Sequence, residues 1–218
     1  MIVETRAAGP FMENGFLLGC ERTREAVLVD PGDGVDALLA DVERHGLRVL
    51  HILLTHAHVD HVTGVPVAKR ALGVPIHLHR DDLFLYERAH QQAVMFGIHI
   101  EPLPPVDRFY SRGEVISFGD YRVHVHHTPG HCPGGVCLRV VKEGSAGDDL
   151  DDLDNLFVGD TLFAGSIGRT DLPGGDYETL INSIREVLFA FGDAARVYPG
   201  HGPATTIGQE RRTNPFLT

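Results

Sequence analysis

The sequence predicts an α/β fold in which helices lie outside packed β-sheets. Apolar runs of strand length alternate along the chain with segments of helical periodicity. Several of the strand-like runs, such as AVLVD (26–30) and LFVGD (156–160), are apolar at nearly every position. A strand of this kind is covered on both faces, so its sheet must be packed against other layers of structure.

The first half of the chain alternates predicted strands and helices. After the strand over 26–30, Pro31-Gly32 ends the run, and apolar residues at helical spacing predict a helix to about Arg44. The next elements are a strand over 49–54, a helix over 65–72 stopped by Gly73, a strand over 74–79, and a helical segment over 81–96 that ends at Gly97.

The second half contains mainly strands joined by turns rich in glycine and proline. Strands are predicted over 115–127, 135–141, 156–160 and 195–199, and a helix over 177–191. The connecting turns include TPGHCPGG (128–135), the loop GSIGRTDLPGGD (165–176) and GHGP (200–203). No repeat or low-complexity linker interrupts the pattern, so we expect a single domain over residues 1–218.

Composition narrows the class of protein. Lys and Arg total 19 and Asp and Glu total 30, which gives a net charge of −11. This charge disfavours nucleic acid and anionic membranes as partners. We expect a cytoplasmic protein for three reasons. The chain has only three cysteines, it does not start with a basic segment followed by an apolar one, and it has no apolar run long enough to span a membrane.

One acidic segment, GDDLDDLDN (147–155), has the composition of a calcium-binding loop. It lacks the glycine at position 6 and the glutamate at position 12 of an EF-hand loop. A solvated surface hairpin is therefore the expected structure, and the role of the segment is left open.

A dense cluster of ligand-type residues, THAHVDH (55–61), follows the strand over 49–54. Alternate residues of an extended segment share a face, so His56 and His58 can converge on one ion. Asp60 and His61 lie past the turn and can face a second ion. Imidazole and carboxylate together suit zinc, iron or manganese.

Three further turns repeat one arrangement, in which a ligand-type residue follows an apolar strand beside glycine or proline. His131 lies in TPGH (128–131), Asp160 ends LFVGD (156–160), and His201 lies in YPGHGP (198–203). Adjacent glycines allow the backbone to approach a metal closely. Five histidines and two aspartates at strand ends are unlike surface decoration, so we expect all seven to bind metal.

The ordered set THAHVDH, TPGH, GD and PGHGP resembles the metallo-β-lactamase superfamily, whose fold is an αββα sandwich of two mixed β-sheets flanked by helices. Within that superfamily, residues 162–176 and 206–216 resemble small bacterial glyoxalase II-like (hydroxyacylglutathione hydrolase-like) enzymes. The resemblance implies two divalent ions, with zinc favoured and iron or manganese as alternatives. It places His56, His58 and His131 on the first ion, Asp60, His61 and His201 on the second, and Asp160 between them.

The resemblance also implies an activity, the hydrolysis of a thioester such as S-lactoylglutathione by a metal-bridging hydroxide that Asp60 orients. A thiolate leaves without protonation, since a thiol pKa is about 8.5. The C-terminal helical domain with which larger relatives grip glutathione is not expected here. Arg169 is the nearest counterpart of a family lysine that contacts a glutathione carboxylate; alternatively, it pairs with Asp171 or Asp176 and stiffens its loop.

A second enzyme class shares the fold and a similar GRTD-containing loop. Persulfide dioxygenases hold a single iron with residues that match His56, His131 and Asp160, a 2-His-1-carboxylate set suited to oxygen chemistry. The hydrolase ligand set contains these three residues, so the ligands alone do not separate the two classes. Hydrolysis of a β-lactam also remains open, because the fold does not fix the substrate.

Overall fold

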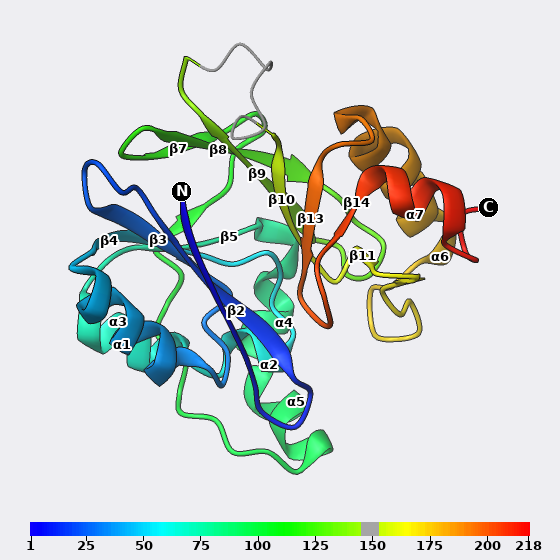
Figure 1. The fold of residues 1–218 in the computed structure, drawn as a ribbon. Helices are drawn as coiled ribbons and strands as arrows, with labels where there is room; N and C mark the ends of the chain where they lie inside the picture. Colours follow the sequence, from blue (N-terminus) through cyan, green and yellow to red (C-terminus); the bar gives the residue numbers. More distant parts are fainter. Residues whose placement is uncertain (145–152) are drawn as a thin grey trace. The chain divides into compact units, whose positions relative to one another are not determined.

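The computed structural model describes residues 1–144 and 153–218. Contacts divide the chain into two compact units, Met1–Tyr110 (unit 1) and Ser111–Thr218 (unit 2). Each unit has a six-stranded mixed β-sheet with helices beside it (Figure 1). A single domain over 1–218 remains a prediction. Across the two described ranges, no helix has the length and apolar character needed to cross a bilayer.

Unit 1 has a sheet with the strand order β1-β2-β3-β4-β5-β6, in which β1 to β3 are antiparallel and β3 to β6 are parallel. Its elements are β1 (Ile2–Ala8), β2 (Glu13–Gly19), β3 (Glu25–Val29), α1 (Val35–His45), β4 (Arg48–Leu53), α2 (Val59–Val62), α3 (Val65–Leu72), β5 (Ile76–Leu78), η1 (Arg80–Asp82), α4 (Leu83–Glu87), α5 (Ala89–Phe96) and β6 (Arg108–Phe109).

The central strands of unit 1 confirm the sequence predictions and position its functional residues. The strand β3, the helix α1 and the helix α3 lie where they were predicted, and Gly73 ends α3 with a φ of 67°. Because β3 and β4 are parallel neighbours, their carboxyl ends meet at one edge of the sheet. The amide of Asp30, which follows β3, donates to the carbonyl of Leu53 at 3.1 Å.

Unit 2 has the strand order β14-β13-β10-β9-β8-β7, and β10 and β13 are its parallel pair. Its elements are β7 (Val115–Phe118), β8 (Tyr121–His127), β9 (Val136–Lys142), β10 (Asn155–Gly159), β11 (Leu162–Phe163), β12 (Ser166–Ile167), α6 (Tyr177–Asn182), the π-helical turn η3 (Ser183–Val187), the 3-10 helix η4 (Leu188–Phe191), β13 (Arg196–Pro199), β14 (Thr205–Thr206) and α7 (Ile207–Thr213).

Two predicted elements of unit 2 need correction. Residues 115–127 are the hairpin β7–β8 and not one strand, because Gly119 turns the chain with a φ of 56°. Residues 177–191 are not one regular helix, because a π-helical turn follows α6 and a 3-10 helix follows that turn. The acidic segment over 147–155 falls largely on residues 145–152, which lie outside the described residues.

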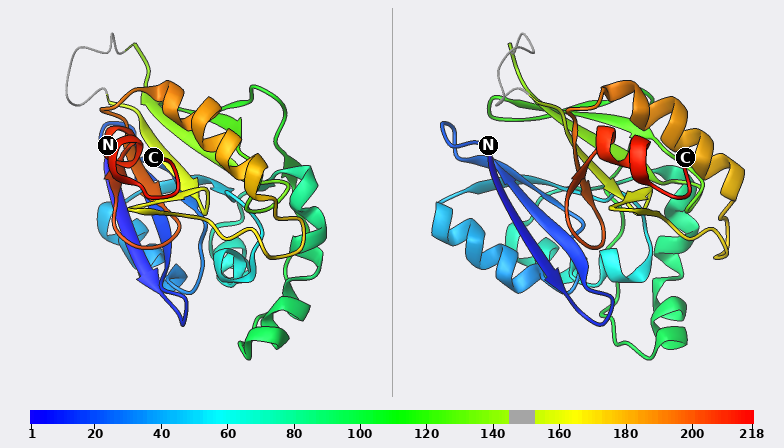
Figure 2. Two further views of the ribbon diagram at one scale, coloured as in Figure 1. Left: turned by 90° about the vertical axis from the view of Figure 1, so that its right-hand side faces the viewer. Right: turned by 45° about the vertical axis from the view of Figure 1, so that its right-hand side comes forward.

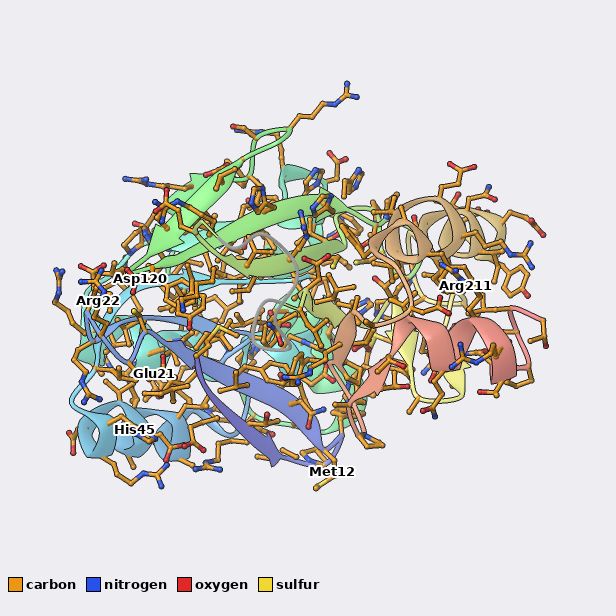
Figure 3. All side chains as sticks on the ribbon, turned by 45° about the horizontal axis from the view of Figure 1, so that its top comes forward. Met12, Glu21, Arg22, His45, Asp120 and Arg211 are labelled. Carbon is orange, nitrogen blue, oxygen red and sulfur yellow. The ribbon has the colours of Figure 1, made fainter. Side chains whose placement is uncertain are left out.

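The core of unit 2 lies between its sheet and the helical segment 177–191, which runs along the sheet in both views of Figure 2. Leu180, Ile184 and Leu188 repeat at intervals of four residues and are all fully buried. Ile207 on α7 joins the same apolar cluster. Arg211, labelled in Figure 3, is an exposed residue of α7 whose guanidinium pairs with Asp193.

Candidate metal centre

The predicted cluster of unit 1 forms on the short segment between β4 and α2. His56, His58 and His61 are buried, and the rings of His56 and His58 meet at a centroid distance of 4.9 Å with perpendicular planes. The rings of His56 and His61 lie closer, at 4.0 Å. The Asp60 carboxylate is 3.9 Å from Nε2 of His61. The structure therefore brings together all four residues that the sequence predicted in this unit.

Two carboxylates that were not predicted from the sequence lie behind His61. Nδ1 of His61 is 3.1 Å from Oδ2 of Asp30 and 3.8 Å from Oε1 of Glu13, and both acids are buried. Asp30 also accepts hydrogen bonds from the amide and hydroxyl of Thr55. When Nδ1 of His61 donates to Asp30, Nε2 carries the lone pair and is available to a metal ion.

A sequence signal for Asp30 was present. It ends the apolar run AVLVD (26–30) in the same way that Asp160 ends LFVGD (156–160). Asp30 has a φ of 45°, a left-handed conformation that few residues other than glycine adopt. Its backbone turns the chain out of β3 while its side chain stays buried.

Close backbone packing explains the glycines of this region. A Cβ on Gly32 would lie 2.1 Å from Oε2 of Glu13 and 2.4 Å from the carbonyl oxygen of Asp60, and a Cβ on Gly34 would lie 2.9 Å from the carbonyl oxygen of Arg6. The Gly-x-Gly spacing after β3 thus serves tight packing.

Two side chains from the following helices hold the metal-ligand segment of unit 1. The carboxylate of Asp82 accepts a hydrogen bond from the amide of Ala57 at 3.1 Å. The side-chain oxygen of Gln92 on α5 accepts one from the amide of Val59 at 3.2 Å. These bonds fix the backbone on either side of His58, so its direction is set before any ion binds.

In unit 2 the two predicted histidines, His131 and His201, both lie close to the carboxylate of the third predicted residue, Asp160. Oδ2 of Asp160 is 3.6 Å from Nε2 of His131 and 3.5 Å from Nε2 of His201. The other ring nitrogen of His131, Nδ1, lies 2.8 Å from the carbonyl oxygen of Arg169. That contact favours a proton on Nδ1 and leaves Nε2 as the ligand atom.

Parallel pairing brings Asp160 and His201 together, because β10 and β13 end at the same edge of their sheet. The amide of Gly200 donates to the carbonyl of Gly159 at 2.9 Å, directly before the two predicted ligands. A Cβ on Gly168 would lie 1.9 Å from the carbonyl oxygen of Asp160, so this position requires glycine.

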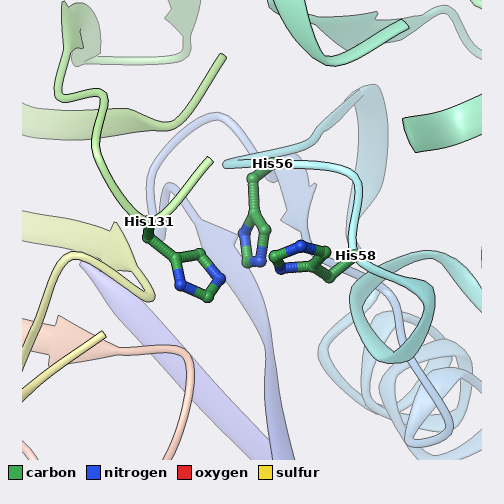
Figure 4. A group of neighbouring side chains, drawn as sticks. All are labelled: His56, His58 and His131. Atoms are coloured by element: carbon green, nitrogen blue, oxygen red, sulfur yellow. The ribbon is translucent and has the colours of Figure 1, made fainter. Parts of the chain in front are cut away.

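The turn that carries His131 rests on the helical segment of unit 2. Figure 4 shows His131 on the segment after β8, and His56 and His58 on the segment after β4. A Cβ on Gly130 would lie 2.2 Å from the amide nitrogen of Leu180, so α6 leaves room only for glycine there. The hydroxyl of Ser183 donates to the carbonyl of Pro129 at 2.7 Å.

Arg169 is engaged by a neighbour. Its Nε and Nη2 atoms each lie 2.7 Å from a carboxylate oxygen of Asp171, and the hydrogen bond from Arg169 lowers the pKa of Asp171 to about 2. Asp176 instead caps α6 by accepting from the amide of Thr179. Of the two partners considered for Arg169 as an alternative to substrate binding, Asp171 is thus the one with which it pairs.

The side chains present fit metal ions by their chemistry. Each cluster combines imidazole nitrogens, all of them buried except that of the partly exposed His201, with a carboxylate, the donor set that zinc, iron and manganese share. In each cluster a carboxylate or carbonyl oxygen at Nδ1 of a histidine orients the ring and favours Nε2 as the ligand atom.

Comparisons with known proteins agree with this chemistry. A family model described as the metallo-beta-lactamase superfamily matches residues 8–201. The hydroxyacylglutathione hydrolase GloC of Haemophilus influenzae is 37% identical and covers 100% of this chain and 98% of that protein.

Two solved structures are similar over the whole chain. BLEG-1 B3 metallo-beta-lactamase has a TM-score of 0.86 and 36% identity, and the match covers 100% of both chains. TTHA1623 in a di-iron-bound form has a TM-score of 0.84 and 42% identity, covering 99% of this chain and 100% of that one. The chain belongs to the metallo-β-lactamase superfamily as a metallo-hydrolase, with two mixed β-sheets flanked by helices and with His/Asp clusters that fit metal ions.

Proposed function

We propose that this protein hydrolyses a thioester, with S-lactoylglutathione as the first candidate, and that it uses two divalent ions. The observation that carries the proposal is the full-length similarity to a protein named hydroxyacylglutathione hydrolase, in a chain that retains all seven His and Asp positions of the resemblance.

We assign the first ion to His56, His58 and His131, the second to Asp60, His61 and His201, and the bridging position to Asp160. Contacts within each unit support this assignment. His56 and His58 lie ring against ring. Oδ2 of Asp160 is almost equally distant from His131 and His201, one ligand of each ion, as a bridging carboxylate requires. Zinc is the proposed metal, and the di-iron form of a similar protein makes iron the alternative to test.

Bound ions supply a Lewis acid for the carbonyl oxygen and lower the pKa of water towards 7. The residues of the chain supply orientation. The Asp60 side chain is partly open to solvent and is proposed to accept a hydrogen bond from the attacking water. A C–O bond then forms at the thioester carbon as the C=O electron pair moves to the carbonyl oxygen. That pair returns as the C–S bond breaks with its electron pair on sulfur, and the proton that the water gives up passes to solvent. No general acid is needed, because the thiolate is already a stable leaving group.

The decisive experiment measures thioester hydrolysis by the zinc-loaded protein in air and under nitrogen. We expect equal rates of S-lactoylglutathione hydrolysis, because Lewis-acid chemistry involves no redox change. The matched variants His61→Ala and His201→Ala each remove a ligand of the second ion and should reduce turnover sharply.

Two other outcomes would contradict the proposal. Oxygen uptake with glutathione persulfide, by a protein holding one iron and unaffected by His61→Ala and His201→Ala, would assign the chain to the dioxygenases. Rapid opening of a chromogenic cephalosporin without thioesterase activity would favour a β-lactam substrate, the class that the name of BLEG-1 B3 metallo-beta-lactamase suggests for that similar protein.

A further inference from the structure

A buried acid outside the proposed metal centre, Glu210 on α7, makes three hydrogen bonds within unit 2. Its side chain is 0% exposed. Oε1 accepts from the hydroxyl of Thr205 at 2.6 Å, and Oε2 accepts from the amide of Gly165 at 2.8 Å and the side-chain amide of Asn214 at 2.9 Å. Burying a carboxylate is costly unless hydrogen bonds compensate, and these three do so.

The bonds from Glu210 and Asn214 converge on the turn of the β11–β12 hairpin (residues 162–167). Gly165 is the turn residue, with a φ of 73°, and it donates to Glu210. Asn214 also donates to the carbonyl of Ser166 at 3.0 Å. Glu210 on α7 and Asn214 directly after α7 therefore hydrogen-bond to a backbone amide and a backbone carbonyl of the same tight turn.

Both ends of this hairpin reach proposed metal ligands. The hairpin begins two residues after Asp160. At its other end, Gly168 packs so closely on the carbonyl of Asp160 that no Cβ fits between them, and the carbonyl of Arg169 lies 2.8 Å from Nδ1 of His131. The turn that Glu210 holds thus limits the movement of both ligands.

The remaining bond of Glu210 reaches the segment after the third ligand. Thr205 lies four residues beyond His201 and pairs with Val197 of β13. The connection between β13 and β14 is therefore fixed at its C-terminal end, where Thr205 is held both by the sheet and by the buried carboxylate of Glu210.

We propose that Glu210 is a positioning residue for the metal centre. Through the β11–β12 hairpin it sets the place of Asp160 and the ring orientation of His131, and through Thr205 it restrains the segment after His201. This inference rests on the proposed function only in taking these three residues as metal ligands.

Four variants test it. Glu210→Ala removes all three bonds. Glu210→Gln can retain them, because its oxygen accepts from Gly165 and Asn214 while its amide donates to the hydroxyl of Thr205. Thr205→Val removes one bond with little change of shape. Gln209→Ala changes an exposed neighbour on the same helix and serves as the control.

The readouts are the rate at which the metal-loaded protein loses its ions to a chelator and hydrogen exchange over residues 160–169 in the metal-free protein. We expect Glu210→Ala to release metal about tenfold faster and to exchange faster in this segment. Thr205→Val should change both readouts less. Glu210→Gln should stay close to the wild type, and Gln209→Ala should match it.

A Glu210→Ala protein that melts earlier but releases metal and exchanges over 160–169 like the wild type would overturn the positioning role. If Glu210→Ala fails to fold, Thr205→Val decides by the rate of metal release, because it frees the segment after His201. A wild type that binds no divalent ion would overturn both the inference and the proposed function. A wild type that binds two ions without thioesterase activity would contradict the proposed function alone.

Discussion

The two ligand clusters are built in different ways. In unit 1, the four proposed ligands come from one stretch of six residues, and carboxylates from elsewhere in the unit orient one of them, His61. In unit 2, the three proposed ligands come from three separate turns, and backbone carbonyls and glycines hold these turns in place. The first cluster therefore depends on the charge of Asp30 and Glu13. The second depends on the space that Gly130 and Gly168 leave.

The two sheets also differ in how deeply they bury histidines that are not proposed ligands. This difference leads to the largest expected effect, a loss of stability in acid. His77 on β5 of unit 1 is 1% exposed, and burial, with smaller contributions from His51 and Arg108, lowers its pKa to about 4. On β8 of unit 2, burial also lowers the pKa of His124 and His126, but both keep partial contact with solvent.

Acid should therefore destabilise the fold through His77. The unfolded chain takes up a proton at this residue near pH 6.5 and the folded chain only near pH 4, so stability falls as the pH drops between these values. The shift corresponds to at most about 3 kcal/mol. Urea unfolding at pH 7, 6 and 5, with chelator present, should give a steeper pH dependence for the wild type than for His77→Gln. Identical slopes would show that His77 does not carry the effect.

The next effect tests the cluster of unit 2, which depends on the space that its glycines leave. In Gly168→Ala the new Cβ would overlap the carbonyl oxygen of Asp160, at 1.9 Å, so the backbone must move by about 1 Å. A displacement of that size at a catalytic group costs about a hundredfold in rate. Thioester turnover and bound metal should both fall. In the control Gly135→Ala, in the turn after His131, the backbone is not left-handed and the atom nearest to the new Cβ is the carbonyl oxygen of Thr128 at 3.1 Å, so the loss should be much smaller.

A milder change tests the cluster of unit 1, which depends on the charge of its buried carboxylates. Asp30→Asn keeps an oxygen for the amide of Thr55 but removes the negative charge beside Nδ1 of His61. Metal affinity, measured by competition with a chelator, should fall about tenfold to a hundredfold. Glu13→Gln, at the longer distance of 3.8 Å, should cost less. A larger loss for Glu13→Gln would reverse the proposed order of the two acids.

The same contrast explains what could be predicted from the sequence. The contiguous cluster was recognisable from spacing alone, since residues two apart in an extended segment share a face. Local signals also located β3, α1 and α3. Pro31-Gly32 separates β3 from α1, and Gly73 marks the end of α3.

Features that depend on distant partners were not predicted. The strand β2 (ENGFLLG) begins with polar residues at buried positions, so it lacked an apolar run of full length. The π-helical turn after α6 contains Ser183, whose hydroxyl bonds to Pro129, a residue 54 positions earlier. Glu210 acts on Gly165, a residue 45 positions away, and no local pattern reveals that contact.

The smallest expected effect concerns Arg169, whose guanidinium is held by Asp171 in a pair that is largely exposed to solvent. If Arg169 binds a substrate carboxylate, that carboxylate must compete with Asp171 for the same two donor atoms. Arg169→Ala should then raise the KM for an anionic thioester about threefold to tenfold and leave an uncharged thioester nearly unaffected. Asp171→Asn should have the opposite effect and lower the KM for the anionic substrate, because it frees the guanidinium. A loop-stiffening role predicts a different pattern, in which both variants weaken turnover of both substrates to a similar degree. Initial rates for the two variants on the two substrates separate these roles, since only competition for the guanidinium moves KM in opposite directions.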